Sequence, residues 1–334
     1  MTGDTTAAQS PRPGVGSRVR LRDRMGQTEL VALSVLAVTA VLTLVAILIN
    51  HNSSATNVIW SVFALSLVTA VAAYGQTIVV LTGGLDLSIP WVMTMGGVFL
   101  SAWSGSSGGQ GAAAFVAVLL MGAIVGLVNG LGIVVVKVPA VVMTLAMNGV
   151  LEGAVLIYTN GAPNGSAPQF LVRLMNGRGA WGIPYSVWIL LGAAVLGAFL
   201  LRGTAYGRRV YAVGASRRAA ALAGLRSNVI VASAYVISGT TSALAGALLT
   251  GFSQQSYLGM GDQYLLPSIA AVVIGGASVL GGRGRYVGTV AGVLLLTSIG
   301  IVMSGRSSDA TKTVTFGASV LVTALLFNRS RSHQ

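Results

Sequence analysis

The chain has 334 residues, of which 54% are apolar and only 8% are charged, and its formal net charge is +13. A soluble domain carries about 25% charged residues because its surface must be hydrated, so this composition excludes a soluble globular enzyme. The chain contains no cysteine, which excludes disulfides, thiolate metal sites and cysteine nucleophiles. His51 and His333 lie too far apart to suggest a metal cluster. We therefore expect a membrane protein without a metal ion or another cofactor.

Runs of about 20 mainly apolar residues are long enough to cross a bilayer. Ten such runs predict an all-α polytopic membrane protein of about ten transmembrane helices, the third, eighth and tenth being the weakest. The expected spans are residues 29–50, 58–82, 88–104, 112–136, 139–159, 185–202, 228–251, 264–280, 286–304 and 313–327. They predict one transmembrane domain over residues 29–327, between a disordered basic tail (1–28) and a short C-terminal tail (328–334).

The basic residues indicate how these spans are oriented. With the N-terminus in the cytoplasm, sixteen of the 20 Lys and Arg residues fall on the cytoplasmic side. Only Arg173, Arg178, Arg306 and Lys312 fall outside. This asymmetry follows the positive-inside rule, and it places both termini in the cytoplasm. The positive charge is therefore explained by topology within a lipid bilayer, and no nucleic-acid partner is expected.

A weak internal repeat is visible in the apolar sequence. Ile89-Pro90 followed by Gly96-Gly97 is similar to Leu266-Pro267 followed by Gly275-Gly276. The two segments would cross the membrane in opposite directions, as inverted repeats require. The glycine-rich run 275–284 follows no strand and is typical of a broken or re-entrant helix. The lysines, Lys137 and Lys312, do not form a Gly-Lys-Ser/Thr motif, so the chain lacks a nucleotide-binding P-loop.

Two acidic residues lie in or beside the expected spans, and ionisable residues at membrane depth are functional candidates. Asp86 precedes a helix that restarts after Gly83-Gly84, so it would cap that helix or act directly on a substrate or gate. Glu152 would pair with a basic group or face a wet cavity.

Uncharged polar residues inside the spans can hydrogen-bond between helices or form a weakly polar pathway for an uncharged, hydroxyl-bearing solute. These residues are Gln76, Asn129, Thr144, Asn148, Ser233, Ser238, Thr240, Thr241 and Ser242. Most of them are expected to act only in packing. We expect Gln76, Asp86, Ser88 and Asn148 to face the pathway or to support its broken helices.

Two polar segments interrupt the spans. Residues 160–184 lie outside and include a short helix over Pro168–Met175, predicted to lie in the membrane interface. Residues 203–227 form a charged cytoplasmic segment. There Gly214 can turn the chain and Ser216 can cap a short helix over Arg217–Leu222, which ends before Gly224.

Three blocks of this sequence resemble the ribose-type permease subunits of bacterial ABC importers, which share a superfamily with branched-chain amino-acid permeases. They are Tyr74–Ser88 (YGQTIVVLTGGLDLS), Tyr206–Leu225 (YGRRVYAVGASRRAAALAGL), and Gly275–Gly284 with the following Tyr286–Gly292. The resemblance covers roughly residues 58–305 in the same order and spacing. It implies a permease in the bacterial inner membrane that imports a monosaccharide or related polyol. It also implies ABC ATPase partners, an extracytoplasmic solute-binding protein and a second permease subunit, forming a homodimer.

The resemblance also assigns the cytoplasmic segment 203–227 to coupling with the ATPase. The residues implied in this contact are Gly207, Arg208, Gly214, Ser216, Arg217, Arg218, Ala220 and Gly224. Ala220 would allow close docking, while Arg217 and Arg218 would pair with acidic groups of the partner. Since the chain has no P-loop, we expect that it is not itself an enzyme and that ATP is hydrolysed by the partner chain.

Three departures from the family pattern leave the solute open. Ser216 stands where the family usually has Asn, Pro90 where Gly is usual, and Glu152 where Arg is frequent. A branched-chain amino-acid permease is the nearest alternative. A secondary transporter is less consistent with the sequence, because Asp86 and Glu152 are the only acids available for proton coupling. A membrane-bound enzyme would need a catalytic constellation that the sequence lacks.

Overall fold

The computed structural model describes residues 39–45, 47–48, 54–104, 110–303, 314 and 317–318. The described residues are helical with no strand, apart from an isolated bridge between Arg178 and Pro184. The long helices are α2 (Ala55–Leu81), α4 (Gln110–Val134), α5 (Ala140–Thr159), α7 (Tyr185–Gly203), α10 (Ser227–Ser253) and α12 (Tyr286–Met303). The shorter ones are α3 (Ile89–Ser104), α6 (Gln169–Asn176), η2 (Ala180–Gly182), α8 (Ala205–Ala215), α9 (Arg217–Leu222), η3 (Asp262–Tyr264) and α11 (Leu265–Ile274).

The fold class is confirmed as all-helical, but the count of ten spans is not confirmed. Six helices among the described residues are long and apolar enough to cross a membrane. The expected third and eighth spans are the shorter helices α3 and α11, of 16 and 10 residues. Of the expected first span (29–50), residues 39–45 and 47–48 are described and are helical. Most of the expected tenth span (313–327) and both tails, 1–28 and 328–334, lie outside the described residues.

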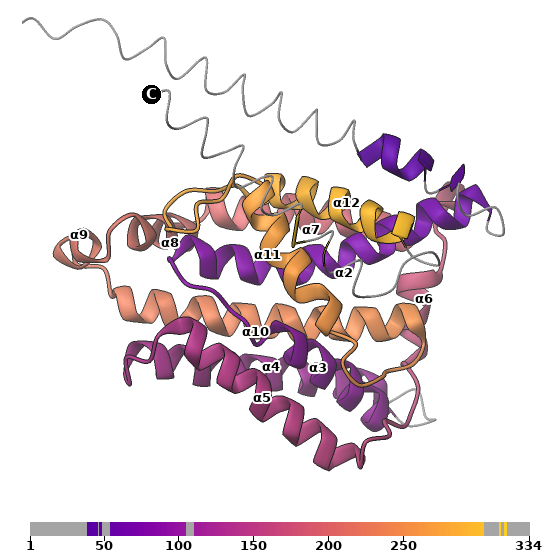
Figure 1. The fold of residues 1–334 in the computed structure, drawn as a ribbon, viewed down its shortest axis with the longest axis horizontal. Helices are drawn as coiled ribbons and strands as arrows, with labels where there is room; N and C mark the ends of the chain where they lie inside the picture. Colours follow the sequence, from indigo (N-terminus) through magenta and orange to yellow (C-terminus); the bar gives the residue numbers. More distant parts are fainter. Residues whose placement is uncertain are drawn as a thin grey trace, which may run out of the picture.

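Helix α10 lies at the centre of the bundle and packs against α4, α2 and α3 (Figure 1). Small residues allow this close packing, which in lipid replaces the hydrophobic effect as the source of helix association. A Cβ atom at Gly122 of α4 would clash with the backbone of Gly239 of α10, and one at Gly126 would clash with the Tyr235 carbonyl. The α4–α10 contact therefore depends on glycine at these positions.

Two breaks interrupt the helical bundle. After α2 ends at Leu81, residues 82–88 run back towards the middle of the bundle, where α3 begins (Figure 1). Residues 275–285 similarly separate α11 from α12. The helices α3 and α11 run in opposite directions, as an inverted repeat would require (Figure 1). The glycine pairs are not equivalent, however, because Gly96-Gly97 lies inside α3 whereas Gly275-Gly276 follows the end of α11.

The starts of the two short helical segments contact each other. The Gly261 amide, just before η3, donates a 3.1 Å hydrogen bond to Thr94 Oγ1 of α3. A side chain at Gly261 would clash with the Pro90 carbonyl. The first turn of α3 therefore rests directly on the chain that leads into α11.

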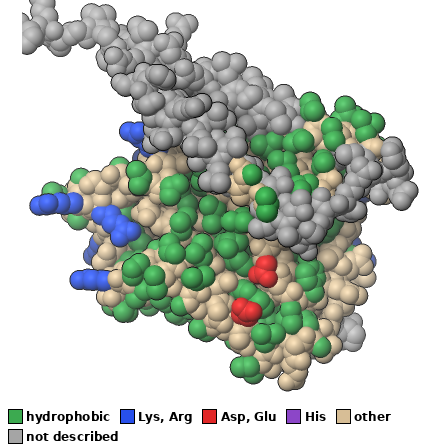
Figure 2. All heavy atoms as spheres, in the orientation of Figure 1, with side chains coloured by type: hydrophobic (Ala, Val, Ile, Leu, Met, Phe, Trp, Pro, Cys, Tyr) green, Lys and Arg blue, Asp and Glu red, His purple; other side chains and the backbone are tan. Residues whose placement is uncertain are grey.

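The two polar segments contain the two short helices that the sequence predicts, α6 and α9, and the second segment also contains α8, which is not predicted. On one side, α6 occupies residues Gln169–Asn176 after Pro168, and its buried Leu171 and Met175 pack the helix onto the bundle. On the other side, α8 and α9 lie within residues 203–227. Lys and Arg side chains gather at the α8–α9 end of the molecule (Figure 2).

Candidate functional site

The segment between α2 and α3 is shaped by two glycines. Gly83 adopts a φ of +83°, which L side chains rarely adopt, and so it allows the chain to turn away from α2. Gly84 lies against the Tyr235 hydroxyl, where a Cβ atom would clash. That hydroxyl also donates a 3.4 Å hydrogen bond to the Leu85 carbonyl. The backbone therefore approaches α10 closely at this point.

Asp86 holds this segment in place by hydrogen bonding. The residue is only 1% exposed. Its Oδ1 atom accepts from the Ser88 amide at 3.0 Å and from the Ser88 hydroxyl at 2.6 Å. Its Oδ2 atom accepts from the Ser238 hydroxyl of α10, also at 2.6 Å. Hydrogen bonds to a carboxylate are short and strong, so this one side chain joins the break to the central helix.

The expectation that Asp86 caps α3 needs correction in its detail. Asp86 accepts from Ser88, which precedes the helix, rather than from an amide in the first turn of α3. The amide of Trp91, in that first turn, instead donates to Asn148 Oδ1 of α5 at 3.3 Å. Likewise, the Leu87 amide donates to Thr144 Oγ1 at 3.0 Å. The free amides are satisfied by a neighbouring helix, which a local sequence motif cannot reveal.

Three of the four expected pathway residues therefore meet at one junction. Ser88 bonds Asp86 and accepts a 3.0 Å hydrogen bond from Asn129 Nδ2 of α4, while Asn148 supports the first turn of α3. Asn129, Thr144 and Ser238 complete the junction. They are among the polar residues expected to act in packing, and their partners are distant in the sequence.

Gln76 stands apart from this junction. It is fully buried in α2, yet both its amide nitrogen and its amide oxygen lack a hydrogen-bond partner among the described residues. One turn further along, Val80 packs against Val272 of α11. An unsatisfied buried polar group lowers the free energy of unfolding by about 1–3 kcal/mol, so Gln76 destabilises the fold at this position.

The other acids of the described residues are exposed. Glu152 of α5 and Asp262 of η3 lie close enough for their charges to interact. Two acidic side chains are visible close together on the face shown in Figure 2. Glu152 therefore neighbours another acid, and of the two expected alternatives, a basic partner or a wet cavity, the first is not seen among its described contacts.

The segment that the resemblance assigns to coupling has the predicted local structure. The Ser216 hydroxyl accepts from the Ala219 amide at 3.2 Å, and the helix that follows spans Arg217–Leu222. Gly224 has a φ of +78° just beyond it. At the start of α8, Thr204 accepts from the Gly207 amide at 3.2 Å, and Gly207 is buried against Leu201.

Gly214 connects this segment to the broken helix. A Cβ atom at Gly214 would clash with the Leu81 carbonyl and lie 2.6 Å from the Gly282 amide nitrogen. The Gly282 amide itself donates to the Leu81 carbonyl at 2.9 Å. Since Leu81 is the last residue of α2, three segments meet where the chain turns towards Asp86.

The exposed surface of α9 differs from the expected one. Ala220 is 4% exposed and packs inside the chain, so it is not available for the close docking that we expected. Arg217 and Arg218 are exposed, and Leu222 is 85% exposed. Sequence reasoning missed Leu222, because the nearby Leu225 is equally apolar and only the packing of α9 distinguishes the exposed leucine.

Six apolar helices long enough to cross a membrane and a break between packed helices are typical of membrane transport proteins. Residues 58–326 match the family described as branched-chain amino acid transport system / permease component, and the chain belongs to this family. As a permease component it relies on a separate ATPase chain and a solute-binding protein, and it is a multi-pass inner-membrane protein.

Among characterised relatives, the ribose import permease protein RbsC of Bacillus subtilis is 35% identical over 268 residues, covering 79% of this chain and 82% of the relative. RbsC of Escherichia coli K12 is 34% identical over 277 residues, covering 80% and 86%. The autoinducer 2 import system permease protein LsrC of Salmonella choleraesuis is 34% identical over 253 residues, covering 72% and 69%. No solved structure matches the chain.

The hydrogen bond between Asp86 and Ser238 can be tested against a matched neighbour. We expect Ser238→Ala to lower the free energy of unfolding by about 1.5–3 kcal/mol, because it removes a buried hydrogen bond to a charged group. Ser242→Ala is the control, since Ser242 lies one turn along α10 and is fully buried, but its hydroxyl has no partner among the described residues. The free energy of unfolding of both variants is measured by denaturant unfolding in lipid nanodiscs. Equal losses would contradict the role of Asp86.

Proposed function

We propose that the chain is the permease subunit of an ATP-driven importer for a monosaccharide or related polyol, delivered by an extracytoplasmic binding protein. The observation that carries this is the match to two ribose import permease proteins over about four-fifths of the chain. The unpartnered side-chain amide of Gln76 supports it, because an amide can hydrogen-bond an uncharged polyol. A branched-chain amino acid is the alternative solute, favoured only by the description of the family.

In this proposal, the junction of Asp86, Ser88 and Asn148 supports the pathway, and Gln76 contacts the solute. The contacts of the first three residues are satisfied within the chain, so they hold α3 in position. Gln76 retains two unused hydrogen-bonding groups. A movement of α11 away from α2 would open the face of α2 that carries Val80 and Gln76 and would offer both groups to a passing hydroxyl.

The contact with the ATPase is proposed to lie on α8 and α9, with Arg217, Arg218 and Leu222 on its surface. Leu222 would insert into an apolar pocket of the ATPase, and the arginines would face acidic groups around it. Movement of this end would reach the pathway through Gly214 and the last residue of α2, which are in contact. In the orientation that the positive-inside rule predicts, α9 and both termini lie in the cytoplasm. A second copy of the chain would complete a homodimer.

Gln76 provides the test of the solute and its path. We expect Gln76→Leu to retain or raise thermal stability, because it removes an unsatisfied buried amide, and to reduce uptake at least about tenfold. Uptake of radiolabelled ribose and, separately, leucine is measured in proteoliposomes that contain the co-expressed ATPase and binding protein. Ser66→Ala is the control, since Ser66 is another buried, unpartnered residue of α2. Uptake of leucine would contradict the proposal that the solute is a sugar. Ribose uptake by Gln76→Leu at the wild-type rate would contradict the proposal that Gln76 contacts the solute.

Leu222 provides the test of coupling. We expect Leu222→Ser to abolish co-purification with the ATPase, because an exposed side chain can be changed without disturbing the fold. Leu280→Ser is the matched control: Leu280 is equally exposed, at 85%, but lies on the loop 275–285 rather than on α9. If Leu222→Ser co-purifies normally, the contact lies elsewhere. If only Leu280→Ser fails, that loop is the contact.

A further inference from the structure

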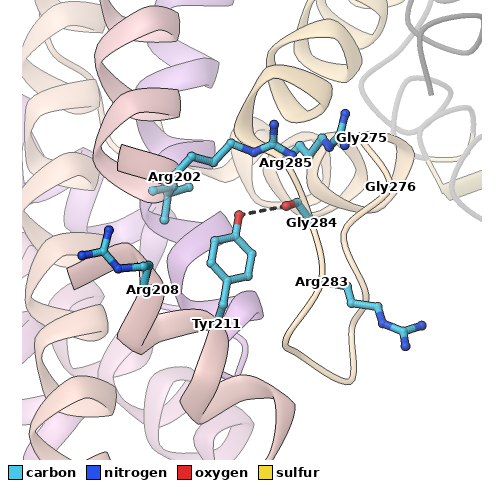
Figure 3. A pocket seen from close by; sticks show the side chains of 9 residues that line it. Arg202, Arg208, Tyr211, Gly275, Gly276, Arg283, Gly284 and Arg285 are labelled. Carbon is cyan, nitrogen blue, oxygen red and sulfur yellow. Dashed lines mark hydrogen bonds between the residues drawn. The ribbon is translucent and has the colours of Figure 1, made fainter. Parts of the chain in front are cut away.

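A cationic cavity of about 490 Å³ lies where the end of α7, the helix α8 and the loop 275–285 meet. Four arginines line it: Arg202, Arg208, Arg283 and Arg285. Figure 3 shows that Arg202 extends towards Arg285 above Tyr211, whereas Arg283 points away from them. Arg208 is also one of the residues implied in the ATPase contact, whereas Arg202, Arg283 and Arg285 have no part in it. The cavity includes part of the glycine-rich run 275–284.

The fold holds the walls of the cavity in place, and the side chains of all four arginines are exposed at its surface. The Tyr211 hydroxyl donates a 2.8 Å hydrogen bond to the Gly284 carbonyl, which fastens α8 to the loop (Figure 3). Gly276 adopts a φ of +84° at the wall, and a Cβ atom there would meet nothing within 4 Å. Arg202 lies at the end of α7 and Arg285 directly before α12, and these two helices pack together.

The positive charge in the cavity is not balanced by the described part of the chain. The acids of that part are Asp86, Glu152 and Asp262, and none of them lines the cavity. Burial raises the pKa of the Tyr211 hydroxyl, while the charges of Arg202 and Arg285 act on it in the opposite direction. The two guanidinium groups are therefore close enough to influence the same atom. Arginines gathered in this way favour an anion, and the planar guanidinium group matches the oxygens of a phosphate.

Exposed apolar side chains lie close in sequence to two of the cavity's arginines. Phe199 and Leu200 of α7 are 61% and 37% exposed and precede Arg202 by three and two residues. Val287 of α12 is 57% exposed, immediately after Arg285 and Tyr286. An anion that carries a hydrocarbon chain could contact both the arginines and these apolar side chains. A free phosphate would contact only the arginines.

We propose that this cavity binds the phosphate headgroup of an anionic phospholipid from the cytoplasmic leaflet, with an acyl chain lying along α7 and α12. The proposal uses the orientation given above, with α9 inside, but it does not depend on the transported solute. The bound lipid would join the end of α7 to the start of α12. Because α8 and the loop 275–285 form the same cavity, occupancy would also stabilise the contacts that Gly214 and Gly282 make with Leu81.

Native mass spectrometry of the full-length chain, released from detergent with added lipid, tests this proposal. The probes are phosphatidylglycerol, phosphatidylcholine and inorganic phosphate. We expect the wild type to bind phosphatidylglycerol selectively, and Arg202→Gln/Arg285→Gln to bind it at least about tenfold more weakly. Arg209→Gln/Arg226→Gln is the matched control, because it removes two exposed arginines from the same end that do not line the cavity. This control should bind like the wild type.

Three outcomes would overturn the proposal. Equal binding of phosphatidylglycerol by the wild type and both double variants would show that the cavity is not the lipid site. Inorganic phosphate bound as tightly as phosphatidylglycerol would assign the site to a free anion. Loss of ATPase co-purification with lipid binding intact would assign the arginines to the protein partner. If the Gln pair fails to fold, Arg202→Lys/Arg285→Lys retains the charge and should still weaken binding, because the planar fork is lost.

Discussion

The backbone between Leu81 and Ile89 leaves the helix and runs into the bundle, where Asp86 and Ser88 are buried. Each unsatisfied amide or carbonyl there costs several kcal/mol, so a break is tolerated only where protein groups replace the missing hydrogen bonds. Asp86 within the break, Thr144 and Asn148 of α5, and the Tyr235 hydroxyl of α10 meet this requirement. The packing of α4, α5 and α10 around the start of α3 follows from it.

The same break connects the segment proposed to contact the ATPase with the short helices α3 and α11. Its first residues lie against Gly214 and Gly282, which belong to the segments proposed to meet the ATPase and the lipid. Its last residues lead into α3, whose first turn rests on Gly261 ahead of η3 and α11. A displacement at α8 therefore has a continuous path of contacts to both short helices. The glycines at these contacts leave no side chain to absorb such a displacement.

Local features could be predicted from the sequence because their causes are local. The helix Arg217–Leu222, its Ser216 cap and the turn at Gly224 depend on neighbouring residues, and they are present as predicted. The restart of a helix after Gly83-Gly84 is also present as predicted, although α5 satisfies the amides at its start. The partner of Asp86 could not be predicted, because Ser238 lies 152 residues away and only the folded bundle brings them together. The burial of Ala220 and the exposure of Leu222 also depend on tertiary packing, since a six-residue helix has no periodicity that identifies its buried face.

Hydrogen–deuterium exchange of the Leu87 and Ser88 amides, measured in lipid nanodiscs, tests most directly whether Asp86 holds the break in place. The Leu87 amide donates to Thr144 and the Ser88 amide donates to Asp86, so we predict slow exchange of both amides in the wild type. In Asp86→Leu the carboxylate is lost, and exchange at both positions should be much faster while the amides of α4 stay protected. Rapid exchange in the wild type, or unchanged protection in Asp86→Leu, would contradict the account.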